Sequence, residues 1–197
     1  MPLITTRSNA SARGYGAFLA AASSTSFESI ATYSVGSGGS STITFSSIPT
    51  NYAHLQLRVI ARSSFTTDSD FLGIRFNSDS GSNYNEHALF GQGSSASAMF
   101  NTSTYCIVQR IATDNHNASV FGAVVMDILD YQNTNKYTTT RNLGGFDNNT
   151  SGQIYFESNL WRNTAAITSI TITSAYGVSY LFKQYSHFAL YGIPGAA

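Results

Sequence analysis

The densest apolar run of the sequence is Val120-Phe-Gly-Ala-Val-Val-Met-Asp-Ile-Leu-Asp-Tyr131. Its β-branched residues favour a strand, because branched side chains lose conformational freedom in a helix and pack well on a pleated sheet. Side chains alternate between the two faces of a strand, so Val124 and Met126 share one face while Val125 lies on the other. Both faces are largely apolar, which is typical of a strand in the middle of a sheet. We therefore predict a central strand with one face in the core and the other covered by the N-terminal segment, a loop or a neighbouring subunit.

The sequence on either side of this run continues the β pattern. Polar turn-forming residues 132–136 follow it, and residues 137–146 form a second long strand, so we expect these two strands to pair. Leu55, Leu57 and Val59 alternate with mostly polar side chains, which predicts another strand with one core face. The remaining predicted strands cover residues 27–35, 41–45, 72–76, 87–90, 104–111, 154–160, 167–172 and 187–193.

Two connecting segments have distinctive compositions. Residues 36–40 read Gly-Ser-Gly-Gly-Ser, and their glycines can supply the positive φ angles of a hairpin turn between the strands at 27–35 and 41–45. Residues 91–104 are rich in Ser, Ala and Gly, so we predict a long surface loop there. Such a loop is either a solvated connection or a binding surface.

The overall composition also indicates a β protein. The 197 residues include 29 Ser, 21 Thr and 15 Asn, whereas charged residues make up only 10% of the chain. Ser, Thr and Asn favour strands, turns and caps, because their side chains compete for backbone hydrogen bonds inside helices. Thirteen Phe and twelve Tyr supply ample material for a hydrophobic core.

About ten or eleven short strands in one chain of this length predict a single all-β domain over residues 27–197. Two sheets packed face to face, in a jelly-roll-like β-sandwich, close most economically. An immunoglobulin-like sandwich is the second choice, because Cys106 is the only cysteine and no disulfide can form within the chain. We expect the Cys106 side chain to be a small buried apolar group.

Residues 1–26 differ from the rest, since small and polar residues dominate and no period of 2 or 3.6 is sustained. Such a segment buries too little surface to offset its ordering entropy, so we predict an extended arm that lies against a partner and serves attachment or assembly. The candidate attachment residues are the two arginines and the two aromatic residues of the segment, Arg7, Arg13, Tyr15 and Phe18.

Charge and hydropathy argue against two classes of partner. Ten basic and ten acidic residues give a formal charge of zero with no basic cluster, so nucleic-acid binding lacks its main electrostatic driving force. The apolar stretch 17–22 has six residues, whereas a membrane-spanning helix needs about 20. Gly14 and Gly16 interrupt the region that would otherwise resemble a signal peptide, and we predict neither a membrane segment nor a leader.

We also predict no catalytic, cofactor or metal site. The nucleophile elbow, the phosphate-binding loop, the zinc-protease helix motif and paired cysteines are all absent from the sequence. Four histidines, at positions 54, 87, 116 and 187, are far apart along the chain. Residues 77–81, Asn-Ser-Asp-Ser-Gly, have the oxygen spacing of a calcium loop, but the twelfth position is Ala88 instead of Glu, so we expect an ordinary turn.

Two features leave carbohydrate chemistry open as an alternative. Asp127, Asp130 and Glu157 are candidates for the paired carboxylates of a glycoside hydrolase, by their positions alone. Trp161, the single tryptophan, is a candidate sugar-stacking platform, although core packing is the commoner role of such a ring.

Several strings resemble small virion proteins of tailed bacteriophages. They are Asn9-Ala-Ser-Ala-Arg-Gly-Tyr-Gly-Ala-Phe18, Ile128-Leu-Asp-Tyr-Gln-Asn-Thr-Asn-Lys136, Leu143-Gly-Gly-Phe-Asp147 and Phe188-Ala-Leu-Tyr-Gly-Ile193. The likeness is greatest to jelly-roll decoration and fibre-type proteins, in which a short N-terminal segment attaches to the particle and a β-sandwich faces outward.

This resemblance implies a non-enzymatic structural protein on the virion surface, with the major capsid protein or another virion protein as its partner. It also implies self-association, most simply as a homotrimer. A capsid decoration or cement protein attached through residues 1–26 is the leading expectation. A tail-fibre or receptor-binding module that recognises a host glycan through Trp161 or residues 91–104 is the alternative, and a carbohydrate-active enzyme is a more remote one.

Overall fold

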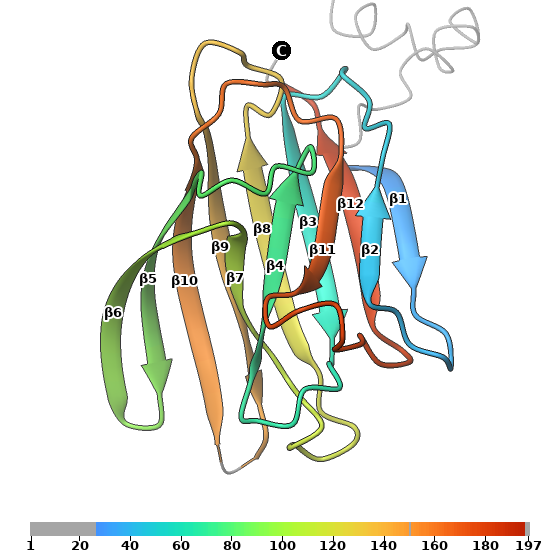
Figure 1. Cartoon of the computed structure of the whole chain (residues 1–197), viewed down its shortest axis with the longest axis vertical. Coiled ribbons are helices and arrows are strands. Elements are labelled where there is room, and N and C mark those ends of the chain that lie inside the picture. The colour runs from blue at the N-terminus through green and yellow to red at the C-terminus, as the bar shows by residue number, and fades with distance from the viewer. Residues whose placement is uncertain (1–26, 150, 196–197) are drawn as a thin grey trace, which may run out of the picture.

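The computed structural model describes residues 27–149 and 151–195. Within these ranges the chain forms twelve β-strands and no helix, arranged in two antiparallel sheets that face one another (Figure 1). The predicted all-β sandwich is confirmed. The strands are β1 (Glu28–Ser34), β2 (Thr42–Phe45), β3 (His54–Ala61), β4 (Asp70–Phe76), β5 (Tyr84–Gln92), β6 (Ser95–Ser103), β7 (Cys106–Ile111), β8 (Gly122–Leu129), β9 (Thr138–Asp147), β10 (Gly152–Trp161), β11 (Ile170–Ser174) and β12 (His187–Ile193).

The two sheets differ in size. The larger has the strand order β1-β12-β3-β8-β9-β10-β5-β6, and the smaller has the order β2-β11-β4-β7. The chain crosses from one sheet to the other at every connection except those from β5 to β6, from β8 to β9 and from β9 to β10. The strands β9, β10, β5 and β6 extend the larger sheet, and β5 and β6 project beyond the smaller sheet (Figure 1).

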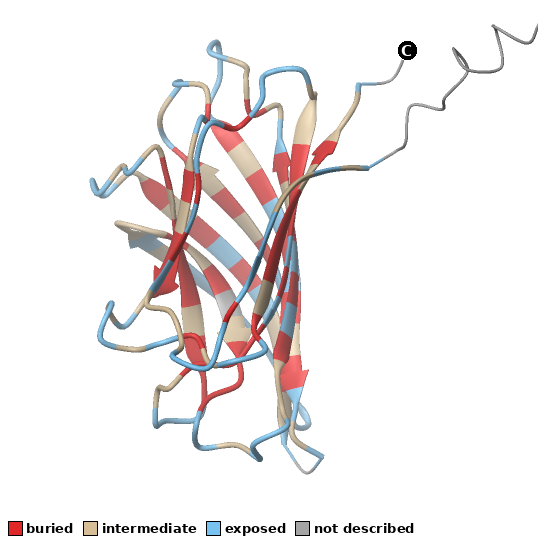
Figure 2. Ribbon diagram, turned by 90° about the vertical axis from the view of Figure 1, so that its right-hand side faces the viewer, coloured by how far each residue is buried: buried red, intermediate tan, exposed pale blue. Residues whose placement is uncertain are grey.

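The core lies between the sheets, and the strand that dominates the sequence pattern is central to it. β8 is the fourth strand of eight, with β3 on one side and β9 on the other. Val124, Met126 and Ile128 point inward and are at most 2% exposed, as the alternation predicts. A similar alternation runs along β9 and β10 and along parts of β3 and β5, whereas the outer strands β1 and β6 contain no buried residue (Figure 2).

The predicted hairpin between residues 27–35 and 41–45 is wrong. β1 pairs with β12 in the larger sheet, while β2 pairs with β11 in the smaller one, so residues 36–40 cross between the sheets. Gly39 does adopt a positive φ of 72°. However, Ser40 bridges to Phe182 instead of closing a turn between neighbouring strands. Burial of both strands over one core outweighs the local turn signal.

The predicted loop at residues 91–104 is also wrong. The end of β5 and the whole of β6 occupy it, and the two strands pair over nine consecutive residues. They are joined by the two-residue turn Gly93-Ser94, in which Gly93 has a φ of 58°. A two-residue turn with glycine first is a common hairpin connection. The low-complexity composition of this segment concealed the hairpin signal. β6 was therefore not predicted, and the structure has twelve strands where about ten or eleven were expected.

Candidate interaction surface

The outer face of the larger sheet carries apolar side chains that no other described element covers. Six of them form one group on five adjacent strands, which we call the outer apolar patch, and each is between 41% and 60% exposed. The patch consists of Ile60, Leu89, Val125, Leu143, Ile154 and Phe156.

Strand register aligns these side chains in rows across the sheet. Val125 lies opposite Leu143, Leu143 opposite Phe156, and Phe156 opposite Leu89. The row therefore runs over four strands without a polar interruption. Directly opposed side chains in antiparallel strands are about 5 Å apart, so these groups form a continuous surface instead of isolated exposed residues. Apolar patches of this kind on a β-sheet mark interaction surfaces.

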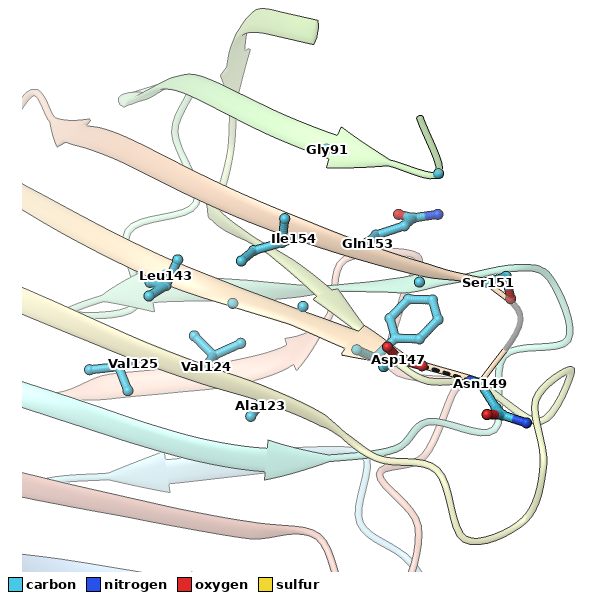
Figure 3. Close-up of a pocket in the computed structure, with 15 residues that line it drawn as sticks. Gly91, Ala123, Val124, Val125, Leu143, Asp147, Asn149, Ser151, Gln153 and Ile154 are labelled. Atoms are coloured by element: carbon cyan, nitrogen blue, oxygen red, sulfur yellow. Dashed lines mark hydrogen bonds between the residues drawn. The ribbon is translucent and has the colours of Figure 1, made fainter. Parts of the chain in front are cut away.

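A shallow hollow of about 820 Å³ lies beside this row (Figure 3). The adjacent row runs Ala123, Gly145, Ile154 and Gly91, so glycines stand where side chains would otherwise fill the surface. Gly145 has a φ of 153°, and a Cβ there would lie 2.0 Å from the carbonyl oxygen of Gln153. Only glycine fits the backbone at position 145, so no side chain can fill the hollow from this position. Asp147 and Asn149, which are joined by a 2.7 Å hydrogen bond from the Asn149 amide, close one end of it.

A polar row borders the patch on its other side. Gln56 donates to Asp127 at 2.8 Å, and Arg141 donates to Ser158 at 2.6 Å. These groups satisfy one another, so the row is a hydrated rim and not a set of unpaired charges.

Phe27, the first described residue, also lies on the outer face of the larger sheet. The Phe27 ring lies 5.1 Å from the guanidinium carbon of Arg58, and the Tyr191 ring lies at the same distance from it. Arg58 is directly opposite Val125 on the outer face. The Phe27 side chain therefore lies on the face of the sandwich that bears the outer apolar patch.

The three acids considered for glycoside hydrolysis do not form one site. Asp127 lies on the outer face, whereas Glu157 points inward and is 1% exposed. Asp130 follows β8 and forms an ion pair with Lys136, and its backbone amide donates to His54 Nδ1 at 2.9 Å. The position of each acid along its strand determines its face, so Asp127 and Glu157 are separated by the sheet itself.

A different pair of acids comes together inside the sandwich, and sequence reasoning missed one of them. Glu86 on β5 and Glu157 on β10 both point inward, with Asn159 opposite Glu86 and Asn142 opposite Glu157. The Asn142 amide donates to Glu157 at 3.1 Å. The alternation of Tyr84, Glu86 and Ala88 could have placed Glu86 on the inner face.

These acids lie close to the one cysteine. Cys106 is fully buried, as predicted from its strand pattern. Burial raises the pKa of the Cys106 thiol, and the negative charges of Glu157 and Glu86 raise it further. The thiol therefore stays protonated and unreactive.

Trp161 contacts residues 77–81, the segment with the oxygen spacing of a calcium loop. Trp161 is 1% exposed and packs against Phe76 and Tyr84, so its ring has no face available to stack on a sugar. Its indole Nε1 donates to Asp79 at 2.8 Å. Asn77 and Ser78 have positive φ angles and the Asp79 amide closes the turn on Phe76, so residues 77–81 form a turn as expected.

The other expectations about sites have simple outcomes. Arg7, Arg13, Tyr15 and Phe18 lie outside the described residues, as does the whole predicted arm. Within the described ranges no three His, Cys, Asp or Glu side chains are grouped so as to hold a metal ion. The same ranges include no helix with the length and apolarity required to cross a bilayer.

Comparison with known proteins identifies no relative of the chain. No family model, no curated protein and no solved structure matches it.

Proposed function

We propose that this chain is a non-enzymatic structural protein of a bacteriophage particle, a capsid decoration protein that stabilises the shell. Residues 1–26 attach it to the particle, and the outer apolar patch packs against a protein of the shell. The observation that carries the proposal is the position of the patch, since a continuous apolar surface and Phe27, the residue that follows the proposed arm, share one face of the sandwich.

Two further observations support this assignment. The order of strands in the two sheets, β1-β12-β3-β8 opposite β2-β11-β4-β7, is the order expected of a jelly roll, the architecture of many viral capsid proteins. Covering the six patch side chains also stabilises a complex by on the order of 1 kcal/mol each, because each one is about half exposed.

The alternatives receive less support from the geometry. A receptor-binding module needs a concave site with polar groups and a stacking ring, but Trp161 is buried and the outer hollow is lined mainly by glycine and aliphatic residues. A carbohydrate-active enzyme needs two carboxylates in one open site. Glu86 and Glu157 share a face, but both are at most 2% exposed.

Reconstitution tests the proposal. Particles of the encoding phage, stripped of the protein, are incubated with the purified full chain and with a Leu143→Asp variant, and bound protein is measured after sedimentation. We expect the wild-type chain to bind and to raise the temperature at which the particles release their genome, and the variant to bind weakly. Ser158→Asp, a change in the polar rim of the same face, is the matched control. Absence of the chain from purified particles, or wild-type binding by Leu143→Asp, would refute the proposal.

A further inference from the structure

The four outer strands of the two sheets differ in how their open edges are protected. Natural proteins blunt exposed strand edges with short strands, charged residues, bulges or covering groups, because the open edge otherwise pairs with another chain. β2 is only four residues long. β1 begins with Glu28 and has a bulge between Ser29 and Ala31.

A side chain of the opposite sheet protects the open edge of β7. Asn159 of β10 donates its side-chain amide to the Ile107 carbonyl at 3.2 Å. β7 also carries the charged Arg110, and its pairing with β4 is irregular between Asp70 and Leu72. Three of the four edges thus have at least one device that hinders further strand pairing.

β6 lacks the short length, the charged residues and the bulge that protect the other edges. It is nine residues long, reads Ser-Ala-Ser-Ala-Met-Phe-Asn-Thr-Ser, and contains no charged residue, proline or glycine. It pairs with β5 over all nine residues without a register shift, so its backbone is regular. In the described part of the chain no strand follows it in the sheet, and it is the outermost strand of the projecting hairpin (Figure 1).

We propose that β6 is a self-association edge, at which the β6 strands of two copies pair antiparallel to form one continuous sheet of sixteen strands. Full overlap of nine residues forms roughly nine backbone hydrogen bonds between the copies. A two-fold axis perpendicular to the sheet relates them, and an interface of this type closes after two chains.

Two properties of the edge favour a second copy as its occupant. Like charges directly opposite one another destabilise strand pairs, and β6 brings no charge to meet its own symmetry mate. β5 and β6 also project beyond β7, so the smaller sheet does not obstruct the approach of the second copy. The inference depends on the sheet edges alone, and it holds or fails independently of attachment to a particle.

Disulfide trapping tests the pairing on the full chain. Single cysteines are introduced along β6 as Ser95→Cys, Ser97→Cys, Met99→Cys and Asn101→Cys, and the proteins are treated with a mild oxidant. The native Cys106 is fully buried and does not interfere. Full overlap places the two-fold axis at Met99, so cross-linked dimer should peak at Met99→Cys and decline on both sides. Thr32→Cys on β1 and Ser158→Cys on the outer face are controls that should remain uncross-linked.

A charge at the edge supplies the second measurement. Ala98→Lys places two ammonium groups near one another across the proposed axis, whereas Thr32→Lys places the same charge on the open edge of β1. Light scattering should give a mass of two chains for the wild type and for Thr32→Lys, and of one chain for Ala98→Lys. A wild-type mass of one or three chains, or cross-linking at Ser158→Cys without any in β6, would overturn the inference.

Discussion

Asp79 lies in the segment 77–81 that has the oxygen spacing of a calcium loop, but its hydrogen bonds give it a structural role. Its carboxylate accepts hydrogen bonds from Trp161 Nε1, from the Gly81 amide at 2.9 Å and from Asn83 at 3.0 Å. Burial raises the pKa of Asp79, but the hydrogen bonds outweigh this effect and hold the pKa below its usual value. The oxygens that could have served a cation instead fix the turn between β4 and β5 to the core tryptophan.

Replacing Asp79 with alanine should therefore destabilise the fold. The change leaves the buried Trp161 N–H without its acceptor, a loss of roughly 1–3 kcal/mol in the free energy of unfolding. Guanidinium unfolding followed by tryptophan fluorescence measures it. Asp68→Ala is the matched control, because Asp68 is exposed and accepts one hydrogen bond from Asn115. Equal unfolding midpoints for the two variants would contradict the prediction.

His116 should make stability depend on pH. Burial lowers the pKa of His116, and the charge of Arg62 lowers it further. The unfolded state therefore binds a proton at a higher pH than the folded state does, and the free energy of unfolding decreases as the pH falls below about 6.5. We expect this slope to be shallower in His116→Gln, measured by urea unfolding at a series of pH values between 7 and 5. Identical slopes in the two proteins would show that His116 is not responsible.

Within each strand of the larger sheet, successive side chains point to opposite faces, so one strand contributes both to the core and to the outer surface. β8 directs Val124 into the core and Val125 toward solvent, although the two residues are chemically identical neighbours. One strand therefore contributes to folding through one face and to the outer apolar patch through the other.

Aspartate at these two positions should produce two different defects. Val124→Asp buries an unpaired carboxylate at a cost of several kcal/mol, comparable to the stability of a whole domain, so no folded protein should be recovered. Val125→Asp places the charge at a position whose side chain is 41% exposed, so the protein should fold and should lose the proposed binding to the particle. Circular dichroism and particle sedimentation distinguish the two outcomes. Two folded variants with wild-type binding would disprove the orientation of β8.

The glycines of β9 and β5 in the outer hollow should respond differently to alanine. Gly145→Ala combines a positive φ with a Cβ placed 2.0 Å from a backbone oxygen, so it should destabilise the protein by more than about 1 kcal/mol. Gly91→Ala meets only ordinary contacts, the nearest at 3.5 Å, and should be tolerated. Thermal melting compares the pair. A melting temperature of Gly145→Ala equal to that of the wild type would contradict the strain argument.

The described part of the chain combines a closed core with an exposed apolar face. The core of the sandwich is built from residues 35–190, and the periodic pattern of the sequence begins at Phe27. We therefore expect the fold of residues 27–195 not to depend on residues 1–26.

Removal of residues 1–26 should leave the fold intact and abolish attachment. A truncated chain that begins at Phe27 retains all twelve strands, so its circular dichroism spectrum and melting temperature should match those of the full chain. Its occupancy on stripped particles should fall to background. The full chain, assayed in parallel, is the control, and wild-type occupancy of the truncated chain would assign attachment to the sandwich itself.

Alternation of side chains along the sequence was sufficient to predict several local features. It identified the strand class, the inward positions of β3, the residues of β8 that share a face, and the burial of Cys106. These features depend on the period of 2 in a strand, a property that each segment carries within itself. The turn at residues 77–81 was predictable for the same reason, because its residue types act on their own backbone.

Strand partners could not be read in this way. β1 pairs with β12 and β2 with β11, each across more than a hundred residues, because every strand offers the same backbone donors and acceptors and only the closing of the common core selects among them. The outer apolar patch arises at the same level. Ile60, Val125 and Phe156 come from segments far apart in the sequence, and only the order of strands in the folded sheet places them on one surface.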